Sequence, residues 1–292
     1  MENGTIATVK ERSRASRFFE SFLRRKTAVL GLILVSTITA VAIAAPLISP
    51  HPPTEIVGPI NGPPARLYPL GTDRVGRDVL TRLIYGTRAS LVIGVGAQSL
   101  SVLIGLALGM GAGYYGGKTD FVLMRIVDVF MAFPFILLAI LVVAAIGPSI
   151  ENVVIAVGVT SWTGTCRILR GETLRLREET YVEAARVIGA SNRRILVRHI
   201  LPNLVPLAVT LATIGVGTAI LSESSLSFLG LGVQPPTPSW GLQLSFAQIV
   251  IFSAPHLAIA PTLAIFLTVL GFNLLGDGLR DALDPREATL RG

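Results

Sequence analysis

One segment of this chain resembles a known functional motif. It covers residues 112–119, Ala-Gly-Tyr-Tyr-Gly-Gly-Lys-Thr, and it ends like a nucleotide-binding P-loop. In a P-loop, Gly-x-x-x-x-Gly-Lys-Ser/Thr, the backbone amides hold phosphates and the lysine reaches them. Here alanine replaces the first glycine, a long apolar run precedes the segment instead of a short strand, and no βαβ pattern follows. We interpret the segment as a tight turn between two helices that binds no ATP.

The other reactive side chains are too few or too scattered to form a catalytic or metal site. The single cysteine, Cys166, permits neither an intrachain disulfide nor a thiolate cluster. The histidines lie far apart, without the spacing of metal ligands, at His51, His199 and His256. An enzyme site requires clustered nucleophile, base or metal ligands. We therefore predict no catalytic residue, no metal ligand and no bound cofactor in this chain.

The composition indicates a membrane protein. Of the 292 residues, 51% are apolar and only 15% are charged, whereas an ordinary soluble domain has roughly 25% charged residues. A soluble fold of this size could not bury so much apolar surface, so a bilayer is the natural surrounding. The net charge of +7 does not indicate nucleic-acid binding, because the charges lie between apolar blocks without interleaved aromatics.

The apolar segments predict six membrane-spanning helices. A helix that crosses ~30 Å of hydrocarbon needs about 20 residues. The segments of suitable character are residues 27–50, 89–117, 129–150, 152–166, 200–222 and 254–276. The fourth is short, so we expect Arg167 to extend it by reaching toward the interface. A Gly- and Pro-rich loop at 230–238 separates the last two spans.

Two patterns around the second span concern packing. Glycines recur every four residues at 105, 109, 113 and 117, a spacing that lets a neighbouring helix approach closely. Before the span, residues 73–88 carry apolar side chains at helical spacing. This predicts an amphipathic helix on the outer membrane surface that orients the bundle, with contact to a partner protein as the alternative.

The distribution of basic residues predicts the orientation. The segments assigned to the cytoplasm hold 20 Lys and Arg residues, and the opposite segments hold five, all between positions 66 and 88. Because cytoplasmic loops carry the excess of Lys and Arg, both termini are expected in the cytoplasm. The span 27–50 is longer than the 7–15-residue apolar core of a signal peptide, so we expect an uncleaved helix, with a cleaved signal as the alternative.

Three charged residues next to apolar runs are functional candidates, because charges within a membrane are expensive. Arg125 and Asp128 are three residues apart on an expected helix, so they share a face and can pair. They lie near the inner interface, where such a pair can simply anchor the helix, and the sequence assigns them no role. Glu223, near the outer end of the span 200–222, is the candidate for substrate contact, with a structural place at the outer rim as the alternative.

The cytoplasmic segment 180–203 contains the most informative local pattern. Small or apolar side chains at i, i+3, i+4 and i+7 share one face of a predicted helix: Tyr181, Ala184, Ala185 and Ile188. Gly189 is expected to end that helix in a left-handed conformation, and Ser191 can cap a second helix. Pro202 is expected to break the second helix before the next span.

These features predict two short amphipathic helices joined by a bend, with small alanines on the exposed apolar side. A shallow surface of small residues suits docking into a groove of another protein. A solvated loop whose helices simply lie on the membrane surface is the alternative, which the residues alone leave open.

The pattern Glu183-Ala184-Ala185, followed by Gly189 and by Ile200-x-Pro202, resembles the EAA motif of membrane permeases of ATP-binding-cassette importers. Residue types, spacing and position between the fourth and fifth spans all agree. Residues 70–91, 225–241 and 273–285 resemble the subfamily for dipeptides, oligopeptides and nickel, and the resemblance covers residues 20–286.

The resemblance implies an all-α membrane protein with six transmembrane helices and the MetI-like fold of type I importer permeases. We expect a cytoplasmic tail (1–26), a first transmembrane helix with an extracytoplasmic loop (27–88), a five-helix permease core (89–279) that includes the EAA coupling loop (167–202), and a second cytoplasmic tail (280–292). In that family the motif sits in a cleft of the ATPase subunit. The resemblance therefore assigns ATPase coupling to Glu183, Ala184, Ala185, Gly189, Ala190, Ser191 and Pro202.

The resemblance also implies partners, in the cytoplasmic (inner) membrane of a prokaryote. These are a homologous second permease, two cytoplasmic ATP-binding subunits that bind the ATP, an extracytoplasmic solute-binding protein and membrane lipid, but no nucleic acid. The expected solute is a di- or oligopeptide, with nickel or a glutathione-like solute as alternatives. A secondary transporter, which needs ion-coupling carboxylates near the membrane midplane, is the remaining alternative class.

Overall fold

A computed structural model describes residues 22–283 of the chain. Residues 1–21 and 284–292, which hold most of the two predicted cytoplasmic tails, lie outside the described part. In chain order the helices are α2 (Lys26–Ile48), α3 (Val79–Tyr115), α4 (Gly117–Ala132), α5 (Phe135–Ile146), α6 (Ile150–Arg177), α7 (Thr180–Val187), α8 (Asn192–Ile195), the π-helix η1 (Leu196–Ile200), α9 (Leu201–Phe228), α10 (Trp240–Ile249) and α11 (His256–Leu283). Between residues 22 and 283 no β-strand forms.

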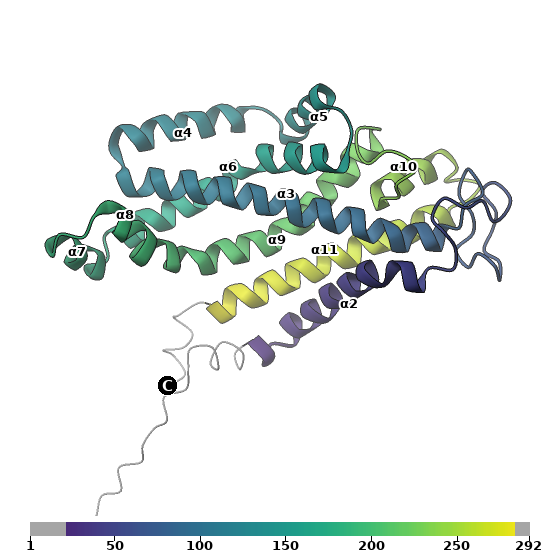
Figure 1. Ribbon diagram of the computed structural model, residues 1–292, viewed down its shortest axis with the longest axis horizontal. Helices are drawn as coiled ribbons and strands as arrows, with labels where there is room; N and C mark the ends of the chain where they lie inside the picture. Colours follow the sequence, from purple (N-terminus) through teal and green to yellow (C-terminus); the bar gives the residue numbers. More distant parts are fainter. Residues whose placement is uncertain (1–21, 284–292) are drawn as a thin grey trace, which may run out of the picture.

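The long helices run side by side in an elongated bundle (Figure 1). Helix α3 packs along α6 and α9, and α11 packs against both α9 and α2. The short helices α7 and α8 lie at one end of the bundle, and α10 lies near the other end together with the loop between α2 and α3. The bundle therefore separates two ends that can take different partners.

The membrane-spanning helices agree broadly with the expected six. In the described part of the chain, α2, α3, α11 and the continuous helical run Asn192–Phe228 are long and apolar enough to cross a bilayer. Helices α4 and α5 meet this criterion only as a pair, bent by 89°. Helix α6 has 28 residues, which is long enough for a further span, but it is not among the helices that are also apolar enough.

The span predicted over residues 129–150 is bent sharply near its start. Helix α4 ends at Ala132, and α5 begins at Phe135 after a sharp bend. Pro134 at this bend cannot continue a helix, and it drives Phe133 into the extended conformation (φ −94°, ψ 137°).

The predicted surface helix over residues 73–88 is also wrong. Residues 73–78 form a turn, and α3 begins at Val79, ten residues before the expected start of the second span. The Asp78 carboxylate caps α3 by accepting hydrogen bonds from the backbone N–H groups of Leu80 (3.3 Å) and Thr81 (2.9 Å). The first turns of α3 are buried in the bundle rather than laid on a membrane surface.

The glycine seam of α3 faces α6. A Cβ atom added at Gly109 would lie 2.5 Å from the carbonyl oxygen of Cys166, and one at Gly113 would lie 2.8 Å from that of Arg170. The spacing of four therefore brings two backbones into contact, as predicted. Gly116, with φ +63°, then turns the chain into α4, which confirms the helix–turn–helix interpretation of the P-loop-like segment.

Ion pairs join α4 to α6. The predicted pair between Arg125 and Asp128 is present at 3.2 Å, and Asp128 also pairs with Arg167. Asp120, one turn into α4, pairs with Arg170. Each aspartate of α4 thus contacts an arginine of α6, which gives Arg125 and Asp128 a structural place between two helices.

Candidate functional site

The helix α7 ends as the sequence predicts. Gly189 has φ +81°, its N–H donates to the carbonyl oxygen of Arg186 (2.9 Å), and the N–H of Ala190 donates to that of Ala185 (3.0 Å). This pair of bonds is the Schellman motif, which closes a helix through one left-handed residue. Because no atom lies within 4 Å of a Cβ added at Gly189, its backbone angle alone demands glycine.

The second short helix begins as predicted but is not broken by the proline. The Ser191 hydroxyl caps α8 by accepting from the backbone N–H of Arg194 (3.4 Å). Helix α8 then continues through the π-helix η1 directly into α9, and Pro202 lies in the first turn of α9. The wider π turn and the N-terminal position both accommodate a residue without an N–H, so the helix bypasses the expected break.

One side of this segment belongs to the core of the bundle. Val182 and Ala185 of α7, Ile195 of α8 and Ile200 of η1 are buried in one apolar cluster. The same cluster contains side chains from the long helices α3, α6 and α9, namely Val102, Tyr114, Leu169, Leu176, Leu204 and Ala208. The inner side of α7 thus shares one close-packed apolar cluster with three long helices.

The other side of α7 is apolar and exposed. Val187 and Ile188 are 83% and 84% exposed, so their side chains contact almost nothing in this chain. Ala184 and Glu183 also face outward, whereas Ala185 packs inward. The prediction that both alanines lie on the exposed side is thus wrong for Ala185, because the helix buries it with Val182.

Polar contacts hold the segment to the bundle. The Tyr114 hydroxyl of α3 donates to the side-chain oxygen of Asn192 (2.9 Å), and the Asn203 amide donates to the carbonyl oxygen of His199 (2.6 Å) and to the Tyr181 hydroxyl (3.3 Å). Burial raises the pKa of Tyr181 above its usual value, and the nearby Glu179 carboxylate adds to the rise. Tyr181 is thus an uncharged bridge between α7 and α9.

Glu223, the candidate for substrate contact, lies in a closed environment in α9. Its side chain is fully buried, and it accepts hydrogen bonds from the hydroxyl groups of Ser227 (2.7 Å) and Ser224 (3.5 Å). The carboxylate also contacts the side chain of Ser239, the residue that caps α10, and it does not line the small cavity at the α10 end of the bundle.

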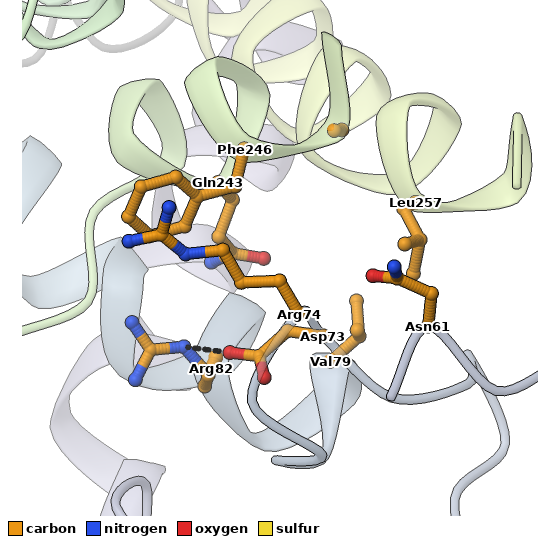
Figure 2. Close-up of a pocket in the computed structure, with 9 residues that line it drawn as sticks. Asn61, Asp73, Arg74, Val79, Arg82, Gln243, Phe246 and Leu257 are labelled. Atoms are coloured by element: carbon orange, nitrogen blue, oxygen red, sulfur yellow. Dashed lines mark ion pairs between the residues drawn. The ribbon is translucent and has the colours of Figure 1, made fainter. Parts of the chain in front are cut away.

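A small cavity lies at the α10 end of the bundle, between the α2–α3 loop, α3 and α10 (Figure 2). Its lining includes Asp73, Arg82 and Gln243, and the Arg74 guanidinium stacks over the Phe246 ring at 3.6 Å. With a volume of about 20 Å³, the cavity is far below the roughly 300 Å³ that a small-molecule site requires. Its lining residues come from several segments of the protein, and the cavity is too small for a peptide-sized solute.

The sequence analysis missed two structural features of this end. The sequence predicts no helix over residues 240–249, but α10 forms there, and Ser239 caps it by accepting a hydrogen bond from the N–H of Leu242 (3.1 Å). The serine followed by an apolar run was a usable signal. Arg82 donates a hydrogen bond to the carbonyl oxygen of Pro236 in the loop before α10. No local sequence pattern indicates this contact, because Pro236 lies 154 residues away.

Comparisons with known proteins cover nearly the whole chain. Residues 105–289 match the family described as binding-protein-dependent transport system inner membrane component, and residues 13–64 match the N-terminal transmembrane domain of oligopeptide transport permease C. The chain is 45% identical to the glutathione transport system permease protein GsiD of Pectobacterium atrosepticum, over 97% of this chain and 95% of that one. It is 48% identical to the protein of the same name from Escherichia coli, over 92% and 89% of the two chains.

A solved structure has a similar fold. A chain of the MetNI methionine ABC transporter in inward-facing conformations superposes with a TM-score of 0.57, covering 70% of this chain and 96% of that one at 20% identity. At this level of identity the likeness concerns the fold alone.

Proposed function

The chain belongs to the family of binding-protein-dependent transport system inner membrane components, and from this premise we propose how it is driven and what it carries. It is a non-catalytic, multi-pass permease subunit of an ATP-binding-cassette importer of the peptide and oligopeptide type. Its fold is the expected all-α, MetI-like fold. Such importers work with ATPase and solute-binding subunits, so the energy enters from outside this chain.

We propose that α7 docks in a cleft of a cytoplasmic ATPase subunit. The observation that carries this proposal is the division of α7 into two sides. Val187 and Ile188 are apolar side chains that the rest of the described part leaves exposed, whereas Val182 and Ala185 belong to the cluster shared with α3, α6 and α9. A force applied to the exposed side therefore reaches the long helices without a flexible link. The residues from Glu183 to Ser191, together with Pro202, form this proposed coupling segment, and the ATP is bound by the partner.

The proposed solute is glutathione or a closely related small peptide. Relatives named as glutathione transport permeases share 45–48% identity with almost the full chain, which favours this solute over the di- or oligopeptide expected from motifs alone. Nickel has no comparable support.

The proposed assembly contains a homologous second permease, two ATPase subunits and one extracytoplasmic solute-binding protein. The excess of basic residues favours a cytoplasmic position of the α7–α8 end and of both termini, although most of the two tails lies outside the described residues. Reporter fusions after residue 283 and within the 51–78 loop test this orientation, since an enzyme active only in the cytoplasm must report the first site and not the second.

The docking surface is tested by Ile188→Asp together with Val187→Asp. A carboxylate placed against an apolar cleft costs several kcal/mol of binding, because it loses its water without gaining a partner. We expect the variant to insert normally but to lose co-purification with the ATPase and at least tenfold of glutathione uptake. Leu67→Asp is the matched control, because Leu67 is also exposed but lies in the α2–α3 loop at the opposite end. Normal uptake by the double variant would reject the proposed docking.

A further inference from the structure

Three exposed arginines follow the coupling segment and form no ion pair with an Asp or Glu between residues 22 and 283. They are Arg193 and Arg194 of α8 and Arg198 of η1. Most arginines of the neighbouring α6 form ion pairs with Asp or Glu, as Arg167 and Arg170 do with the aspartates of α4. Among the described residues, no ion pair or side-chain hydrogen bond engages the three arginines of α8 and η1. A concentrated positive charge therefore remains open on this surface.

The three side chains line an open groove. The groove has a volume of about 300 Å³, and it is lined by Ser191, Arg193, Arg194, Val197 and Arg198. Val197 is 52% exposed, so the groove offers an apolar side chain beside three guanidinium groups and a hydroxyl. This combination fits a ligand that carries a negative group next to an apolar chain.

Buried side chains on the opposite side of the same helical segment anchor the groove to the bundle. Ile195 and Ile200, on the opposite side of the same helical turns, are fully buried in the cluster with α3, α6 and α9. The π-helix η1 contributes Val197 and Arg198 to the groove, and π-helical turns are frequent at functional sites. The arginines are thus fixed on the outward side of a rigid segment.

The position of the groove along the membrane normal matches the headgroup region of a bilayer. The uncharged run that begins at residue 200 continues through α9 to residue 222, which is long enough to fill the hydrocarbon core. At about 1.5 Å per residue, Arg198 lies about 5 Å and Arg194 about 10 Å beyond Leu201. The polar region of a leaflet is about 5–8 Å thick, and long arginine side chains span the remainder.

We propose that this groove binds the headgroup of an anionic phospholipid from the leaflet that α8 faces. The phosphate lies among the guanidinium groups, and Val197 contacts the beginning of the acyl chains. A basic pocket at the end of a spanning helix is the arrangement in which acidic headgroups bind. An acidic surface of a protein partner is less suited, because the groove lies directly next to the uncharged run that begins at residue 200.

The test is a titration of the purified full-length chain with phosphatidylglycerol, cardiolipin or phosphatidylcholine, followed by native mass spectrometry. We expect the two anionic lipids to be retained and phosphatidylcholine not to be. Arg194→Gln should weaken phosphatidylglycerol binding about fivefold, equivalent to about 1 kcal/mol for one basic group. Replacing all three arginines by Gln should weaken it at least tenfold. Lys118→Gln removes the same charge from an exposed site outside the groove and should change binding less than twofold.

Two results would overturn the proposal. One is equal retention of phosphatidylglycerol by the triple variant and the wild-type chain, or equal retention of phosphatidylcholine and phosphatidylglycerol. The other is a triple variant with unchanged lipid binding that no longer co-purifies with the ATPase, which would assign the groove to a protein partner. Lipid retention is measured on the chain alone, so its failure is distinct from failure of the proposed ATPase docking.

Discussion

Arg82 and Asp73 form an ion pair at 3.4 Å that joins the first turn of α3 to the turn that precedes it. The Arg82 side chain is 1% exposed and also donates hydrogen bonds to the carbonyl oxygens of Pro53 (3.0 Å) and Pro236 (3.3 Å). Pro53 belongs to the α2–α3 loop, and Pro236 belongs to the loop before α10. One buried guanidinium group therefore connects three separate segments at this end of the bundle.

Replacement of Arg82 should destabilise the end of the bundle that contains α10 and the α2–α3 loop. Arg82→Met keeps much of the side-chain volume but leaves two carbonyl groups unpaired, and loss of one partner of a buried ion pair typically costs about 3 kcal/mol. Arg77 still pairs with Asp73 at 2.8 Å, so the carboxylate keeps one partner. We expect the apparent melting temperature in detergent to fall by about 5 °C, and the 51–78 loop to become sensitive to protease. Arg66→Gln, at an exposed site in the same loop, should leave both unchanged.

A second prediction concerns the left-handed residue after α7. Gly189→Val places a β-branched side chain at φ +81°, which costs about 1–2 kcal/mol or more and tilts the coupling segment. We expect normal membrane insertion, continued ATP hydrolysis by the assembled complex, and at least a tenfold loss of uptake. Gly189→Asn is the matched control, because asparagine tolerates this conformation, and it should retain most of the uptake. Full uptake by the valine variant would argue against a strict geometric requirement at this turn.

Local chemistry explains which parts of the fold could be predicted. Ser191 and Gly189 act on backbone groups within a few residues, so their types alone indicated a cap and a helix end, and both are present. The long apolar runs likewise indicated most of the spans. Glycine spacing in α3 indicated a close partner helix but could not identify it as α6, because the partner is chosen by tertiary packing.

The errors arise where distant contacts override the local pattern. Apolar side chains at helical spacing over residues 73–88 suggested a surface helix, but Arg82, near the start of α3, is buried because its partners come from remote segments. Pro202 suggested a helix break, but the helix continues from η1 into α9, with Pro202 in the first turn of α9. The EAA segment was assigned its role by resemblance alone. The geometry adds that its two sides face different surroundings, which no linear pattern could separate at Ala184 and Ala185.

A third prediction compares two glycines on the same helix. Gly109→Ala places a methyl group 2.5 Å from the carbonyl oxygen of Cys166, so α3 and α6 must move apart, and such overpacking costs about 1–3 kcal/mol. Gly111→Ala meets nothing within 4 Å and gains helix propensity. We expect a lower melting temperature for the first variant and an equal or higher one for the second. Equal melting temperatures would mean that the seam tolerates separation.

The last prediction addresses Glu223, whose fully buried carboxylate accepts hydrogen bonds from Ser224 and Ser227. If its role is to hold the end of α9, Glu223→Gln keeps an acceptor for Ser227 and should leave the half-saturation concentration for glutathione within twofold of wild type. Glu223→Leu leaves the buried Ser227 hydroxyl without that acceptor, at a cost of about 1–3 kcal/mol, and should lower the melting temperature. Ser225→Ala, at an exposed site on the same helix, controls for substitution in α9. A large change in half-saturation for Glu223→Gln at unchanged stability would instead assign the carboxylate to the solute pathway.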